Sequence, residues 1–167
     1  MYTFVVVNKS MITNKHFMNT INKQELPFVI ISVLSPEYGL DGIQIEKGDY
    51  CQSHLIVYFH DVNDDGSVNS LKEVGDIIIP MNETHAKRII EFVMKWKDKV
   101  NNFIIHCEAG MSRSPGVALA LSEILNGQEN AESFVQTLYD IKFHNPKVKQ
   151  MILDTYKRKK NKLNISG

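Results

Sequence analysis

A short apolar run, Phe103–His106, that leads straight into Cys107 constrains the fold of this chain more than any other feature. Five residues separate Cys107 from Arg113, Gly110 lies among them, and an apolar helical pattern follows. A strand that turns directly into a helix places the cysteine in the positive potential of the helix N-terminus, which favours the thiolate. The loop can curl so that its backbone N–H groups form an anion nest, and Arg113 can bind two oxygens of one anion. This stretch therefore predicts a phosphate-binding cradle above an ionised cysteine.

The arginine content supports this interpretation. Only three arginines, Arg88, Arg113 and Arg158, occur among the 19 lysine and arginine residues. A planar guanidinium binds a phosphate through two parallel hydrogen bonds, and one of these three arginines falls at the position that needs it. A buried cysteine beside an ordinary surface arginine would leave that placement without an explanation.

The length and charge of the chain limit the remaining possibilities. With 167 residues and no net charge, we expect a single domain over 1–167 with a basic tail at about 157–167, and neither nucleic acid nor a membrane as partner. Two cysteines, Cys51 and Cys107, are too few for a disulfide framework and indicate a reducing compartment. We find no targeting segment and no apolar run of about 20 residues. The sequence therefore predicts a monomer in the cytoplasm of the cell or of a host.

The pattern of apolar residues predicts an α/β domain. Short runs rich in Val, Ile, Phe and Tyr predict strands at Thr3–Val7, Phe28–Val33, His54–Phe59 and Phe103–His106. These runs are continuously apolar rather than alternating, which is typical of parallel strands buried on both faces. Helical patterns occur at Asn14–Ile21, Asn82–Lys99, Ser114–Leu125, Asn130–Ile141 and Pro146–Lys160. We expect a mostly parallel sheet of four to five strands, flanked by helices, with a ligand site at the strand ends.

Five residues, His106, Cys107, Gly110, Arg113 and Ser114, match every fixed position of the signature His-Cys-x-x-Gly-x-x-Arg-Ser/Thr. The stretch thus resembles the cysteine-based protein tyrosine phosphatase superfamily, in particular small dual-specificity-like phosphatases and the tyrosine-phosphatase-like proteins of bacteria and phages. The strand–loop–helix context makes the match specific. The resemblance implies a phosphotyrosine-phosphatase-like fold and hydrolysis of phosphotyrosine in phosphorylated proteins or peptides, with two alternatives left open: specificity for phosphotyrosine alone, or hydrolysis of phosphoserine and phosphothreonine as well. It further implies a cysteinyl-phosphate intermediate and no cofactor or metal.

The resemblance also implies a role for each residue of the signature. Cys107 is the nucleophile and Arg113 a phosphate ligand, while His106 fixes the loop and Ser114 donates a hydrogen bond to the sulfur. Phosphate, sulfate or vanadate would bind the backbone amides of the loop residues, which are Glu108, Ala109, Gly110, Met111, Ser112 and Arg113. Because His106 precedes the cysteine on a strand, its side chain should face away from Cys107. We expect the side chain of Glu108 to point outward.

The general acid is expected on a second loop. Asp61 follows the third predicted strand in a Phe-x-Asp pattern that resembles the acid-bearing strand end of dual-specificity phosphatases. In those relatives the acid lies closer to the cysteine in the sequence, and we attribute the difference to an insertion at 66–80. Asp64, Asp65 and, by spacing alone, Asp76 are the alternatives. Loops that leave parallel strands emerge at the same edge of the sheet, so Asp61 should reach the signature loop.

The same acidic segment allows a different interpretation. Asp61, Asn63 and Asp65 resemble the opening of an EF-hand calcium loop, but Lys72 occupies the position that requires a bidentate glutamate. An Asp- and Gly-rich turn explains the segment more simply.

Other functions use the same signature. Phosphoinositides, inositol phosphates and RNA 5′-phosphates are processed by similar loops, although the variable loop positions here hold no lysine. A pseudophosphatase that only binds phosphorylated partners is the non-enzymatic alternative, and the intact Cys107 and Arg113 argue against it. Cys51 offers a further hypothesis, a reversible disulfide with an oxidised Cys107.

Overall fold

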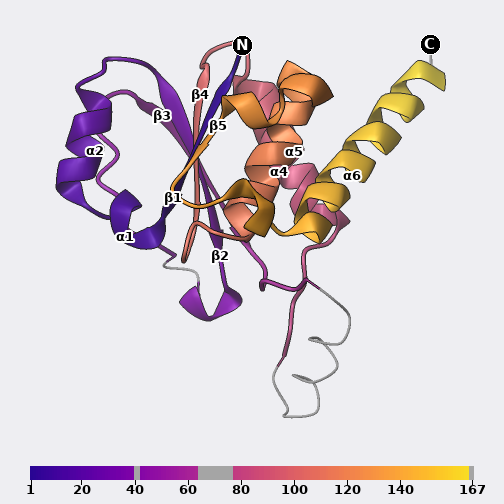
Figure 1. The fold of residues 1–167 in the computed structure, drawn as a ribbon, viewed down its shortest axis with the longest axis horizontal. Helices are drawn as coiled ribbons and strands as arrows, with labels where there is room; N and C mark the ends of the chain where they lie inside the picture. The colour runs from indigo at the N-terminus through magenta and orange to yellow at the C-terminus, as the bar shows by residue number, and fades with distance from the viewer. Residues whose placement is uncertain (40–41, 64–76, 166–167) are drawn as a thin grey trace.

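The computed structural model describes residues 1–39, 42–63 and 77–165. A five-stranded, entirely parallel sheet with the strand order β3-β2-β4-β1-β5 forms the centre of this part of the chain (Figure 1). Its strands are β1 (Thr3–Asn8), β2 (Phe28–Leu34), β3 (Cys51–Tyr58), β4 (Asn102–Cys107) and β5 (Val135–Thr137). The predicted α/β fold and all four predicted strands are confirmed.

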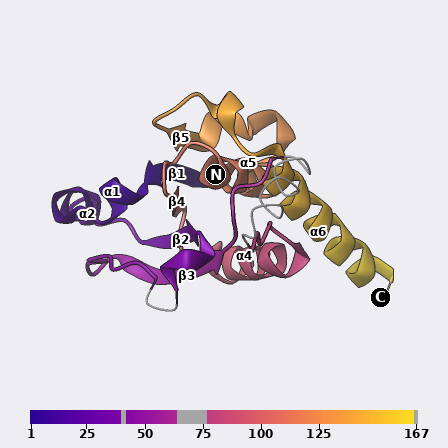
Figure 2. The same ribbon diagram turned by 90° about the horizontal axis from the view of Figure 1, so that it is seen from below.

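Helices cover both faces of the sheet (Figures 1 and 2). One face carries α1 (Lys9–Ile12) and α2 (Lys15–Asn22), and the other carries α4 (Glu83–Trp96) and α5 (Arg113–Asn126), with α6 (Pro146–Ile165) packed against both. Single-turn 3-10 helices are η1 (Pro36–Tyr38), η2 (Gln128–Asn130), η3 (Glu132–Phe134) and η4 (Ile141–Phe143). None of the helices in the described ranges is long and apolar enough to cross a membrane.

Side chains near the helix ends explain where the predicted helices begin and end. The side chain of Asn14 caps α2 by accepting a hydrogen bond from the Phe17 amide at 3.1 Å. Asn82 and His85 form a reciprocal capping box at the start of α4. At the end of α5, Gly127 takes a positive φ of 89°, a conformation that glycine adopts without a steric penalty. The helices predicted at these three places are confirmed.

The core lies on both sides of the two central strands. Every residue of β2 is buried, and successive side chains of β2 and β4 point to opposite faces. Ile31 and Ile105 pack under α4, α5 and α6, whereas Ile30 and Ile104 pack under α1 and α2. Burial on both faces fixes β4 in place, and β4 leads directly into the signature loop.

The prediction of a helix over Asn130–Ile141 is wrong. This segment contains β5, which extends the sheet beyond β1 with Val135 opposite Phe4. Pairing satisfies backbone groups that β1 would otherwise leave unpaired, and the β-branched Val135 and Thr137 suit a strand. The partner of this strand lies far away in the sequence, so the local pattern could not indicate it. The single turn of α1 was not predicted either.

Candidate active site

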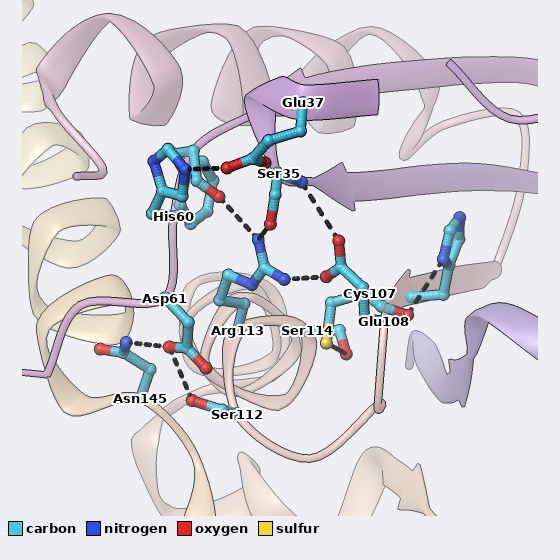
Figure 3. Close-up of polar contacts among 12 residues, drawn as sticks. Ser35, Glu37, His60, Asp61, Cys107, Glu108, Ser112, Arg113, Ser114 and Asn145 are labelled. Atoms are coloured by element: carbon cyan, nitrogen blue, oxygen red, sulfur yellow. Dashed lines mark hydrogen bonds and ion pairs between the residues drawn. The ribbon is translucent and has the colours of Figure 1, made fainter. Parts of the chain in front are cut away.

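The site begins where β4 ends. Cys107 lies opposite Asn8 of β1, and His106 lies opposite Ser32 of β2, so the carboxyl ends of these strands meet at one edge of the sheet. The cradle loop, residues 107–113, then leads into α5 (Figure 3). The Sγ of Cys107 lies 3.1 Å from the Oγ of Ser114, and both residues are buried. Because a thiolate can only accept a hydrogen bond, Ser114 is the donor when Cys107 is ionised.

The bend of the cradle loop requires a glycine. Gly110 has a φ of +72°, and a Cβ at this position would lie 2.8 Å from the carbonyl oxygen of Val7. The amide of Lys9 also donates a hydrogen bond of 3.0 Å to the carbonyl oxygen of Glu108. The loop therefore curls tightly against the end of β1, as an anion nest requires. The side chains of Ala109 and Met111 are exposed on its outer surface.

Arg113 is held firmly beside the loop. Its side chain is only 6% exposed, and its Nη1 donates to the carbonyl oxygen of Phe59 at 2.7 Å and to the Oγ of Ser35 at 3.1 Å. Its Nη2 donates to the carboxylate of Glu108 (Figure 3). A guanidinium has five N–H donors. Among the described residues, these contacts leave Nε–H and one Nη2–H for an anion, which is the number that bidentate phosphate binding uses.

The expectation that Glu108 points outward is wrong. Its Oε2 pairs with Arg113, and its Oε1 accepts a 3.2 Å hydrogen bond from the amide of Ser35. The reason is electrostatic, since a guanidinium as buried as that of Arg113 needs a counter-charge nearby. Glu108 thus contributes a backbone amide to the cradle loop and a carboxylate to the support of the arginine.

Asp61 reaches the cradle loop, as predicted from the strand-end pattern. Its Oδ1 accepts hydrogen bonds from the Oγ of Ser112 at 2.8 Å and from the Nδ2 of Asn145 at 2.7 Å (Figure 3). Both donors bind the same oxygen. Oδ2 is therefore the oxygen that can carry a proton toward a substrate. The side chain of Asp61 lies at the exposed rim of the site.

Asn145 connects the cradle loop, the Asp61 segment and α6. It is fully buried. Its Oδ1 accepts a hydrogen bond from the backbone N–H of Val148 and so caps α6. The backbone N–H of Asn145 itself donates to the carbonyl oxygen of Ser112 at 2.9 Å. Asn145 can approach this closely because residue 116 of α5 is glycine, and a Cβ there would lie 2.7 Å from the carbonyl oxygen of Asn145. One buried amide side chain thereby fixes the position of Asp61.

His60 holds the chain next to Asp61 from the other side. The Nε2 of His60 donates to the Oε1 of Glu37 at 2.7 Å, and its Nδ1 accepts from the amide of Ile79. The hydrogen bond from His60 holds the pKa of the exposed Glu37 carboxyl below its usual value. His60 thus ties the chain on both sides of Asp61 to the η1 turn.

The two remaining predictions about single residues have different outcomes. His106 is fully buried on the opposite face of β4 from Cys107, as the alternation of a strand requires.

Cys51 lies at the start of β3, beside Phe28, and so at the other end of the sheet from Cys107. Burial also raises the pKa of the Cys51 thiol. The hypothesis of a disulfide between Cys51 and Cys107 is therefore wrong.

The other candidate acids are not placed. Asp64, Asp65 and Asp76 lie outside the described residues, as do Lys72 and most of the predicted insertion at 66–80. Asp61 is therefore the one candidate whose position relative to the cradle loop is known.

Sequence reasoning missed two residues of the site, Ser35 and Asn145, and the role of the Glu108 side chain. Ser35 accepts a hydrogen bond from Arg113 and donates one to Glu108, and Asn145 donates one to Asp61. The carboxylate of Glu108 pairs with Arg113. Ser35 directly follows β2, so its place at the carboxyl edge of a parallel sheet was a usable signal. Asn145 precedes Pro146, a combination that marks a helix start but gives no hint of a contact with Asp61.

Comparison with known proteins shows the fold. No protein-family model matches the sequence, and no curated protein sequence matches it. The structure is similar to that of the human tyrosine phosphatase-like serine/threonine/tyrosine-interacting protein, with a TM-score of 0.59 and 14% identity over 95% of this chain and 93% of that one. PTPMT1 in complex with PI(5)P (TM-score 0.48, 15% identity, 96% and 94% covered) and DUSP15 (0.43, 15%, 90% and 86%) match with lower scores. The chain thus has the tyrosine-phosphatase-like fold that its signature implied.

Proposed function

We propose that this chain is a single phosphatase domain that hydrolyses phosphate monoesters through Cys107. Its main substrate is phosphotyrosine in proteins or peptides, and phosphoserine and phosphothreonine are secondary substrates. The observation that carries the proposal is the arrangement of Arg113 beside Cys107. The guanidinium is buried and held by Phe59, Ser35 and Glu108, and the contacts within the described residues leave two of its donors for an anion. Because one fold can host many functions, this site rather than the fold supports the proposal.

The first step is phosphoryl transfer to sulfur. The Cys107 thiolate attacks phosphorus, the S–P bond forms, and the bond from phosphorus to the leaving oxygen breaks. Asp61 gives its proton to that oxygen, so the product leaves as a neutral alcohol or phenol. Arg113 and the backbone amides of the cradle loop stabilise the charge on the three equatorial oxygens.

The second step releases phosphate. Asp61, now a carboxylate, takes a proton from a water molecule, and the water oxygen attacks phosphorus. The S–P bond breaks, and the sulfur leaves as a thiolate that Ser114 stabilises from 3.1 Å. The chemistry of these residues accounts for every proton in the cycle.

The first experiment is hydrolysis of p-nitrophenyl phosphate in the presence of a chelator, with and without vanadate. We expect turnover that vanadate inhibits, that the chelator does not change, and that is lost in Cys107→Ser. A folded, reduced protein that binds vanadate but gives no turnover would favour the pseudophosphatase alternative instead.

A second experiment addresses the substrate. A phosphotyrosine peptide, the same peptide with phosphoserine, a phosphoinositide and an RNA 5′-triphosphate are compared by kcat/KM. We expect the phosphotyrosine peptide to give the highest value, because the Glu108 carboxylate lies beside Arg113 and disfavours substrates with several phosphates. A higher kcat/KM for the phosphoinositide or the RNA would contradict this part of the proposal.

A further inference from the structure

A row of three polar side chains crosses the sheet behind the cradle loop. They are His54 of β3, Ser32 of β2 and His106 of β4. The Oγ of Ser32 lies 2.5 Å from the Nε2 of His106 and 2.6 Å from the Nε2 of His54. Ser32 and His106 are fully buried, and they lie on the face of the sheet that α1 and α2 cover, opposite Cys107. A buried serine between two imidazoles is unusual in strands that are otherwise apolar, because a buried polar group needs a partner.

One direction of the hydrogen bonds in this row uses every contact. The carbonyl oxygen of Cys107 lies 3.4 Å from the Nδ1 of His106 and can only accept, so this contact is a hydrogen bond when Nδ1 carries the proton. The Nε2 of a neutral His106 then accepts, and the single hydroxyl proton of Ser32 is donated to it. Ser32 must in turn accept from the Nε2–H of His54. If the hydrogen bonds ran the other way, the Nδ1 of His106 would carry no proton, and its lone pair would face the lone pairs of the Cys107 carbonyl oxygen.

Both imidazoles are neutral near pH 7. Burial lowers the pKa of His106 to about 4 and that of His54 to about 4. The positive charges that act on the pair are Lys9 and Arg113, which act on His106, and Lys47, which acts on His54, and all three favour the neutral forms. Each ring therefore has one donor and one acceptor.

The end of this row is the first peptide of the cradle loop. A trans peptide is planar, with its C=O and N–H pointing in opposite directions. A hydrogen bond that holds the carbonyl oxygen of Cys107 toward His106 therefore directs the amide of Glu108 the other way, toward the anion position. Through this row, His54 of β3 influences the direction in which the Glu108 amide points.

We propose that Ser32 and His54 are positioning residues that keep His106 in its Nδ1–H form and thereby orient the peptide between Cys107 and Glu108. The catalytic consequence rests on the proposed function, because the oriented amide raises the rate of phosphoryl transfer. The hydrogen-bonded row itself does not depend on that function and can be tested without it.

The first test is nuclear magnetic resonance of the full chain labelled with 15N in its histidines, at pH 7.5. Long-range 1H–15N spectra distinguish the two neutral forms of an imidazole, and loss of one signal in His54→Gln assigns His54. We expect the proton on Nδ1 of His106 and on Nε2 of His54, and a changed His106 spectrum in Ser32→Ala. A proton on Nε2 of His106 would overturn the proposal, whether or not the protein is a phosphatase.

The second test compares kcat and KM in three variants. His54→Leu removes the donor, His54→Gln keeps an N–H near the same place, and Ile30→Val removes one methylene from the same face of β2. We expect His54→Leu to lower kcat about tenfold with a smaller change in KM, since a tenfold change is what one net hydrogen bond contributes. His54→Gln should keep most of the activity, and Ile30→Val should match the unchanged protein.

Equal kcat values in His54→Leu and Ile30→Val would show that His54 only fills space and would overturn the proposed positioning. If the unchanged protein has no phosphatase activity, the proposed function fails, and the affinity of the same variants for vanadate replaces kcat as the measurement. A weaker affinity in His54→Leu than in His54→Gln would then support the row, and equal affinities would refute it.

Discussion

In the proposed reaction the cradle loop supplies the nucleophile and the Asp61 segment, residues 59–62, supplies the acid, but the two are held in different ways. Several contacts within the cradle loop are local, since Ser114 lies seven residues after Cys107, and Glu108 lies five residues before Arg113. Ser35 and Phe59 hold Arg113 from outside the loop. The partners of Asp61 lie 51 and 84 residues away, in Ser112 and Asn145. The attacking group and the anion ligands are therefore encoded in one short stretch that tertiary contacts support, whereas the side-chain hydrogen bonds of Asp61, among the described residues, are all tertiary. Substitutions should separate the two halves.

The largest effect is expected at the nucleophile. Cys107→Ser should lower turnover of p-nitrophenyl phosphate by more than about 10⁴-fold, as loss of a catalytic nucleophile does. Vanadate or phosphate should still bind, because Arg113 and the loop amides are unchanged, and calorimetry measures this. Activity within tenfold of the unchanged protein would refute cysteine chemistry, and Cys51→Ser is the matched control that should retain activity.

The next largest effect is expected at the acid. Asp61→Ala should lower kcat by about 10²–10⁴-fold for phosphotyrosine peptides, whose leaving oxygen needs a proton. The loss should be smaller for p-nitrophenyl phosphate, whose leaving group is stable without one, and steady-state kinetics on both substrates gives the comparison. Asp76→Ala serves as the control. The same leaving-group dependence in that variant and not in Asp61→Ala would move the acid to Asp76.

A smaller effect is expected where Glu108 supports Arg113. Glu108→Ala should lower kcat/KM by about ten- to a hundredfold, because a hydrogen bond to a charged group contributes about 1.5–3 kcal/mol. Glu108→Gln keeps an acceptor and should lose less. Should Glu108→Ala instead raise kcat/KM, the carboxylate would act mainly by repelling the substrate phosphate.

The smallest effect is expected from Asn145, which connects the two regions. Asn145→Ser keeps a side chain that can cap α6 but removes the donor to Asp61. It should lower kcat for phosphotyrosine peptides by about three- to tenfold, the value of one hydrogen bond, and change stability little. Asn145→Ala should lose the same activity and, in addition, about 1 kcal/mol of stability from the missing cap. Thermal unfolding and kinetics together separate the two roles, and an unchanged kcat in both variants would contradict the role given to Asn145.

The same contrast explains how much the sequence could predict. The fold followed from four apolar runs and their helices, because burial on both faces leaves a continuous pattern. The arrangement of Cys107, Gly110, Arg113 and Ser114 followed from one motif. The strand β5 could not be predicted, since its stability comes from pairing with β1 and its own pattern is compatible with a helix.

The side chains that support the site are the part that sequence reasoning missed. Glu108 was expected to point to solvent because its charge alone suggests exposure, and only the burial of Arg113 reverses this. Ser32 and His54 did carry a signal, since each is a polar residue in an apolar strand. Which partner such a residue finds depends on strand order, and the order β3-β2-β4 cannot be read from the chain.

Gly116 sets how closely the start of α6 approaches α5 beside the candidate site. The residue touches neither the sulfur nor the anion site, yet only its missing side chain lets Asn145 approach α5. A change to alanine would force one of the two to shift, because a Cβ at residue 116 would lie 2.7 Å from the carbonyl oxygen of Asn145. Asn145 bonds both to Ser112 of the cradle loop and to Asp61, so such a shift would reach both halves of the proposed site at once. A single added methyl group, placed far from the substrate, would thus measure how closely the two halves must be aligned.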